Sequence, residues 1–140
     1  MALRIGGIKV GESRQETVVE DLKRTQIVQY AGASGDFNPL HSDQEFAVKA
    51  AGYPGVFAHG MLVMGMTGRV LTGWVGRDRL LRYGVRFKAQ VWPGDTLTTT
   101  VTVERIDQDG GGPVAEFSVS TVNQAGVEVV SGTAAARLDG

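Results

Sequence analysis

Cysteine is absent from this sequence of 140 residues. Its absence excludes disulfide bonds, thiolate metal ligands and a cysteine nucleophile, although it fits several cellular compartments. Histidine occurs twice, at His41 and His59, so no third histidine or cysteine completes a common transition-metal site. A zinc enzyme is therefore not expected, and no motif predicts a metal or redox cofactor.

Excess charge and long apolar runs are also lacking. The formal net charge is -1 and 42% of the residues are hydrophobic, which is typical of a globular protein without a basic nucleic-acid footprint. The most apolar segment, residues 59–75, contains Arg69 and falls short of the roughly 20 residues that span a bilayer. The opening residues lack the apolar run of a secretory signal. We expect a cytoplasmic protein with no membrane insertion and one domain over residues 1–140.

The first half of the chain predicts mainly helices. Helical spacing of apolar residues and flanking Ser, Asp, Gly and Pro residues mark where each element begins and ends. Expected are a short extended segment at Thr17–Val19, a helix capped by Asp21 and running through Tyr30, an ordered loop over Ser34–Ser42, a short helix capped by Ser42 or Asp43, and a long apolar helix over Gly60–Trp74. Glycines in the long helix predict close approach of other backbone.

The second half alternates β-branched and polar residues, a pattern that predicts strands. Four strands joined by turns are expected, over Leu80–Val91, Thr96–Ile106, Pro113–Asn123 and Val127–Ala136. Helices followed by an antiparallel meander belong to the α+β class. One long helix wrapped by one sheet is a hot-dog domain. Such a sheet covers one side of the helix, so we expect at least a dimer, formed with a second copy or a paralogue.

The candidate chemistry lies in the loop and at the start of the long helix. Asp36 and His41 flank a turn stiffened by Pro39, which can direct a carboxylate and an imidazole into one cavity. Near neutral pH the carboxylate is ionised while an imidazole exchanges protons, so the two form an acid/base pair. Gly60 opens the helix, and its backbone N–H can stabilise charge that develops on a carbonyl oxygen.

Each of these residues also has a structural interpretation. Asp36 before Asn-Pro can simply stabilise a turn, and Asn38 more readily forms a local bond to the backbone than reacts. His41 can be an ordinary loop histidine. His59 can fix the start of the helix, and Gly60 can be a packing glycine. The methionines of the helix are interpreted as adaptable packing residues.

Two segments resemble a known family. YAGASGDFNPLHSDQEFA, residues 30–47, and AHGMLVMGMTG, residues 58–68, resemble the hydratase motif of the MaoC-like dehydratases, or (R)-specific enoyl-CoA hydratases. The order and spacing of the remaining elements agree, so the resemblance covers nearly the whole chain. Within the family, the sequence is most similar to the catalytic β subunit of heterodimeric (3R)-hydroxyacyl-ACP dehydratases.

The resemblance implies a hydro-lyase that interconverts trans-2-enoyl and (3R)-3-hydroxyacyl thioesters, carried by coenzyme A or acyl carrier protein, in fatty-acid metabolism. It assigns Asp36 and His41 as the catalytic pair, the Gly60 amide as the oxyanion donor, and Asn38 and His59 as supporting loop residues. Some single-chain relatives carry a serine where this sequence has Gly68. That departure leaves the fit of the acyl chain open.

Two rival functions stay open on the sequence. A hot-dog acyl-CoA thioesterase would use the same oxyanion donor but direct water at the carbonyl. A non-catalytic acyl-thioester-binding partner of an active paralogue would need neither Asp36 nor His41. The sequence does not determine the carrier, the chain length, or whether the dimer is a homodimer or a heterodimer.

Overall fold

The computed structural model describes residues 7–140, apart from the side chain of Asp109. Residues 1–6, on which the prediction about the opening segment partly falls, lie outside the described range. The elements in chain order are β1 (Ser13–Val19), α1 (Arg24–Ser34), η2 (Pro39–His41), η3 (Phe46–Ala50), α2 (Gly60–Val75), η4 (Arg77–Arg79), β2 (Leu80–Phe87), β3 (Leu97–Asp109), β4 (Gly112–Val122) and β5 (Glu128–Arg137). The expected helices and strands are therefore present, with shifted ends.

Five strands form one antiparallel sheet in the order β1-β3-β4-β5-β2. The predicted meander holds for β3, β4 and β5, but it is wrong for β2, which pairs with β5. The chain leaves the sheet after Phe87, with Lys88 N–H still donating to Val129 O, and crosses to the far edge through the Pro93-Gly94 turn. Because β1 covers one edge of β3 and β4 the other, β2 has no place beside β3.

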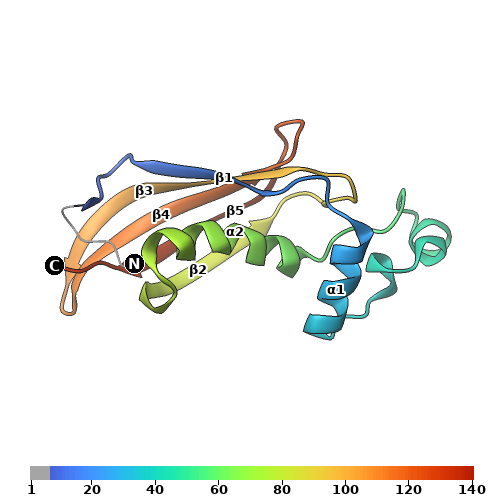
Figure 1. Cartoon of the computed structure of the whole chain (residues 1–140), viewed down its shortest axis with the longest axis horizontal. Helices are drawn as coiled ribbons and strands as arrows, with labels where there is room; N and C mark the ends of the chain where they lie inside the picture. Colours follow the sequence, from blue (N-terminus) through green and yellow to red (C-terminus); the bar gives the residue numbers. More distant parts are fainter. Residues whose placement is uncertain (1–6) are drawn as a thin grey trace.

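The sheet curves over α2, which lies in its hollow as expected for a hot dog (Figure 1). Alternation places Val101 and Val103 of β3 against the helix, while Thr102 between them points away from the core. The aromatic pair Trp74 and Phe117 packs edge to face at the C-terminal end of α2, with ring centroids 5.6 Å apart. Burial of this face holds α2 in place despite its glycines.

Helix α1 begins later than predicted. Its N-cap is Lys23, and Gln26 Oε1 accepts the Lys23 N–H at 3.0 Å. Asp21, the expected cap, lies instead in a left-handed turn with φ of 48°. The turn is imposed by the Gly94-Asp95 turn that precedes β3, because Leu22 N–H donates to Asp95 O and Gly94 N–H donates back to Leu22 O. A tertiary contact thus overrides a local capping preference.

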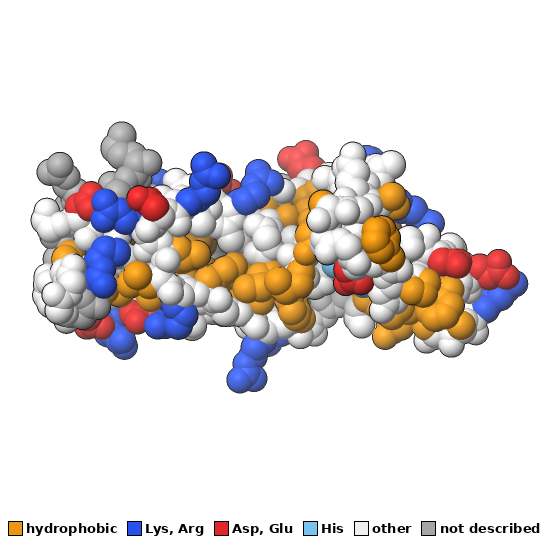
Figure 2. Space-filling model, turned by 90° about the horizontal axis from the view of Figure 1, so that it is seen from below, with side chains coloured by type: hydrophobic (Ala, Val, Ile, Leu, Met, Phe, Trp, Pro, Cys, Tyr) orange, Lys and Arg blue, Asp and Glu red, His pale blue; other side chains and the backbone are white. Residues whose placement is uncertain are grey.

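The underside of the molecule is apolar. Hydrophobic side chains gather in a band over the face where α2 and β2 lie (Figure 2), and Met61, Leu81 and Phe87 are each more than half exposed. The expectation that the helix glycines admit other backbone is not met within the described chain: a Cβ at Gly65 or Gly73 would meet open space. Within residues 7–140, no helix combines the length and apolar character needed to cross a bilayer.

Candidate active site

A tightly bonded loop follows α1. Gly35 ends the helix in the left-handed region, with φ of 77°, and its N–H donates to Ala31 O. The Asp36 carboxylate then accepts the Asn38 N–H at 3.2 Å, and the Asn38 side chain accepts the Leu40 N–H at 3.0 Å. Asn38 therefore makes the local bond that its place before Pro39 suggests, and it caps the short turn that carries His41. Local polar bonds set the backbone on which both candidate catalytic groups stand.

His41 is held in one tautomer. Its Nδ1 lies 2.6 Å from Phe57 O, and a carbonyl oxygen can only accept, so Nδ1 carries a proton. In the neutral ring, Nε2 then bears the lone pair. The ring of Phe57 meets His41 edge to face, with centroids 5.1 Å apart. This arrangement leaves Nε2 as the nitrogen able to take a proton from a bound molecule.

His59 joins the loop to the start of α2. It is 2% exposed, and its Nε2–H donates to Asp36 O at 3.0 Å. Its ring stacks on His41 with centroids 3.9 Å apart, and Tyr30 meets it edge to face at 4.9 Å. Tyr30, which belongs to α1, therefore packs against the ring of His59.

Asp36, His41 and His59 converge. One carboxylate oxygen and one nitrogen from each ring all lie within 4.8 Å of one another, a group that could also hold a metal ion. A water molecule about 2.8 Å from each of two partners spans roughly 4.5 Å between them. Asp36 and His41 can therefore hold one water or one substrate hydroxyl. Asp36 is exposed and His41 half-buried, so the gap between them is reached from solvent.

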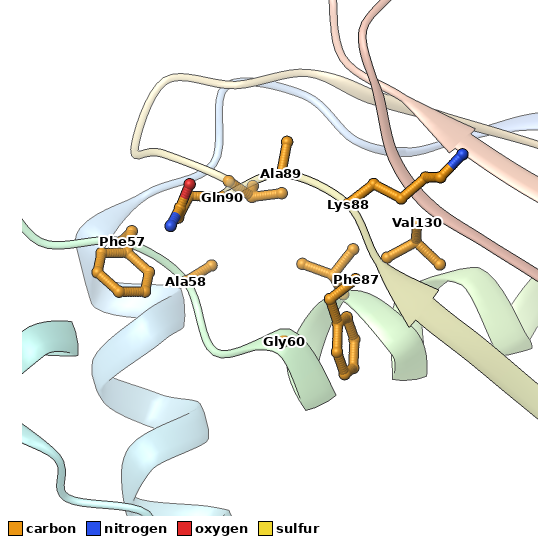
Figure 3. A pocket seen from close by; sticks show the side chains of 10 residues that line it. Phe57, Ala58, Gly60, Phe87, Lys88, Ala89, Gln90 and Val130 are labelled. Carbon is orange, nitrogen blue, oxygen red and sulfur yellow. The ribbon is translucent and has the colours of Figure 1, made fainter.

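A cleft of about 320 Å³ opens beside this group. Gly60 lines it, and as the first residue of α2 its N–H has no partner one turn earlier in the helix. Figure 3 shows the Phe87 ring next to Gly60, the Gln90 side chain directed toward Phe57, and Lys88 extending away. Neither Asp36 nor His41 lines this cleft; Phe57 lines it and also contacts the His41 ring.

Sequence reasoning missed the far wall of the cleft. Residues 87–91 belong to the end of β2 and the link that follows it, where the sequence predicts only an uninterrupted strand. Because β2 pairs with β5, the apolar side chains and the backbone of this link face Gly60. The Pro93-Gly94 pair could not have signalled this, because the predicted strand Leu80–Val91 already ends before it.

One titratable group near α2 departs from its ordinary behaviour. Burial raises the pKa of Tyr83 to about 12, and its hydroxyl donates to Met64 O at 2.8 Å. A Cβ at Gly68 would lie 3.1 Å from the Tyr83 ring. The glycine that departs from the serine of some relatives thus makes room for Tyr83, which ties β2 to the helix.

The sequence profile described as "MaoC like domain" matches residues 7–125 of this chain. The chain belongs to the MaoC-like family. An (R)-specific enoyl-CoA hydratase of Aeromonas caviae is 32% identical over 81% of this chain and 84% of its own length. Three other curated relatives are much longer, and this MaoC-like chain spans 24%, 34% and 32% of their lengths.

Solved structures agree with this placement. An (R)-hydratase from A. caviae superposes with a TM-score of 0.80 at 28% identity, covering 94% of this chain and 97% of that one. The ChsH1-ChsH2 complex of Mycobacterium tuberculosis gives a TM-score of 0.79 at 26% identity, over 93% and 98%. The hot-dog prediction is therefore confirmed, and two relatives matched over most of their length are named (R)-specific enoyl-CoA hydratase and 3-hydroxyacyl-[acyl-carrier-protein] dehydratase.

Proposed function

We propose that this MaoC-like chain is a hydro-lyase that adds or removes water across the 2,3 bond of an enoyl or (3R)-3-hydroxyacyl thioester. The observation that supports it best is the convergence of a carboxylate oxygen of Asp36 and a ring nitrogen of His41 within 4.8 Å, near a cleft that Gly60 lines. Enoyl thioester hydration needs a positioned water and a donor for the thioester oxygen. Both are supplied within one loop and one helix start.

In the hydration direction the thioester oxygen accepts the Gly60 N–H, which stabilises enolate-like charge as C3 is attacked. Asp36 and His41 hold the water. As its oxygen bonds to C3, one water proton passes to this pair, and the pair returns a proton to C2, so that the elements of one water are added. Dehydration reverses the steps. The R configuration of the product is an inference from the relatives, not from the geometry.

His59 and Asn38 are positioning residues in this proposal. His59 holds the Asp36 carbonyl and stacks on His41, while Asn38 shapes the turn between them. Neither needs to exchange a proton with the substrate. Their effect on rate would come through the placement of the catalytic pair, which catalysis requires within a few tenths of an ångström.

We further propose that a second hot-dog chain, a copy or a paralogue, covers the face formed by α2 and β2. The exposed side chains of Met61 and Leu81 and the open space over Gly65 and Gly73 support it, as does a relative whose structure is a complex of two chains. Light scattering should give twice the 14.9 kDa of the chain for a homodimer, and the sum of the two chain masses for a complex with a paralogue. A cytoplasmic location and a single functional unit over residues 1–140 stay predictions.

The first experiment mixes crotonyl-CoA with purified protein and follows the conjugated enoyl thioester absorbance and thiol release in parallel. Loss of the enoyl band without thiol release is expected. Asp43→Asn is the matched control for Asp36→Asn, because Asp43 is in the same loop but caps the Phe46 N–H instead. Thiol release would indicate a thioesterase. Absence of turnover with short and long enoyl-CoA, with enoyl-ACP and with the paralogue added would contradict a hydro-lyase.

A further inference from the structure

The mechanism leaves one buried atom of the site without a use. His59 Nδ1 has no hydrogen-bond partner among the described residues, although the side chain is 2% exposed. Because the Nε2 proton is committed to Asp36 O, the neutral ring directs an unpaired lone pair from Nδ1. A buried polar atom without a partner calls for one, such as a water or an ion.

The two histidines are held in the way that metal ligands are held. In metal sites, a ligating imidazole donates its other N–H to a carbonyl or a carboxylate, which fixes the ring and leaves the lone pair for the ion. His41 donates to Phe57 O and His59 donates to Asp36 O. Each ring therefore keeps one free lone pair, and the third member of the group is a carboxylate, Asp36.

We propose that Asp36, His41 and His59 bind a divalent transition ion, Zn²⁺ above all, and that the ion blocks the active site. Two nitrogen donors and one carboxylate suit zinc better than magnesium or calcium, which prefer oxygen. The inhibition rests on the proposed function, whereas the binding does not. The ion is an inhibitor and not a cofactor, so a chelator should leave the activity of ion-free protein unchanged.

The geometry must adjust before an ion can bind. An ion bound by a ring nitrogen lies in the plane of that ring, so the stacked rings of His41 and His59, whose planes are 25° apart, must open toward the ion. Donors about 2.1 Å from a tetrahedral ion lie roughly 3.4 Å from one another, against a spread of up to 4.8 Å in the structure. His59 is buried and His41 is anchored, so the exposed Asp36 side chain has the most room to move, at the cost of its bond from the Asn38 N–H. A bound ion would occupy the place of the water between Asp36 and His41. Zinc and substrate should therefore compete.

The test titrates ZnCl2 into the metal-free full chain by calorimetry. We expect one ion per chain, and at least about tenfold weaker binding in Asp36→Asn and in His59→Gln. Asp78→Asn is the control, because it removes an exposed carboxylate far along the chain from the site. Circular dichroism checks that each variant is folded. If the His59 variant fails to fold, Asp36→Asn, whose side chain is exposed, still decides the outcome.

The enzymatic arm measures hydration of crotonyl-CoA at several zinc concentrations. A rise in the apparent KM with zinc, reversed by chelator, is expected. Equal zinc binding in wild type and Asp36→Asn, or no binding at millimolar zinc, would overturn the proposal whether or not the protein is a hydratase. Specific zinc binding by a protein without hydratase activity would instead leave the site standing and remove the proposed function.

Discussion

The two ends of α2 differ in what surrounds them. The C-terminal end, with Leu71 and Trp74, is enclosed by inward-facing residues of the sheet such as Val103 and Phe117. The N-terminal end, where Gly60 begins the helix, meets a loop whose residues from Gly35 to Asn38 are all exposed. One helix is therefore a core element at one end and the support of a site at the other.

The comparison separates stability from chemistry. Apolar burial holds the enclosed end, so single truncations there should lower the free energy of unfolding while the folded protein keeps its activity. The site end depends on directed polar bonds, such as those from His41 to Phe57 O and from His59 to Asp36 O. Changes there should alter the reaction while the fold survives. The predictions below test that separation, starting from the largest effect.

Residues at the N-terminal end of α2 should be essential for turnover and contribute little to the free energy of unfolding. Asp36→Asn keeps the acceptor for the Asn38 N–H but removes the charge, so turnover should fall by about 10²- to 10⁴-fold with little change in KM. Enoyl absorbance kinetics measure the turnover, and a thermal unfolding curve measures the stability. Turnover comparable to wild type would remove Asp36 from the reaction.

The enclosed end should show the opposite balance. Phe117→Ala empties a site that is 1% exposed, so the free energy of unfolding should drop by about 3–5 kcal/mol. Phe37→Ala makes the same truncation at a side chain that is 70% exposed, and should change stability by less than about 0.5 kcal/mol. Urea unfolding compares the two. Equal losses would mean that the two ends are not distinct.

The middle of α2 is tied to the sheet through buried hydroxyl groups. Thr67 and Thr99 each lie 2.6 Å from the Thr121 hydroxyl, and all three are fully buried. Thr67→Val keeps the shape and removes one bond, so it should cost about 1–2 kcal/mol. Thr102→Val, on the outer face of β3, should be nearly neutral in the same unfolding assay. A neutral Thr67→Val would show that the helix needs no polar anchor.

Replacing Tyr83 should give the smallest change in stability, and that change depends on pH. Tyr83→Phe removes the bond to Met64 O and should cost about 1 kcal/mol at neutral pH. Burial raises the pKa of Tyr83 from 10.0 to about 12, so the unfolded chain ionises first as the pH rises. The contribution is complete below pH 10 and lost toward pH 12. Stability curves from pH 8 to 12 should be flatter for the variant.

Much of the fold was predictable because it depends on periodicity. The apolar run predicted α2 to within one residue, and alternation located β3, β4 and β5. The cap of α1 and the position of β2 were not predictable in this way. The first was decided by bonds between Leu22 and the Gly94-Asp95 turn, and the second by which sheet edge remained open. Both depend on partners more than 40 residues away along the chain.

The sequence by itself determined the residues that can do chemistry and the local turn that carries Asp36 and His41, because Asx and proline geometry acts over a few residues. Only the tertiary structure decided that His59 and Phe57 orient those residues. Hydrogen bonds reaching 16 and 23 residues along the chain leave no periodic trace in a sequence. The same holds for the cleft, which exists because β2 pairs with β5 at one edge of the sheet and brings its end to Gly60.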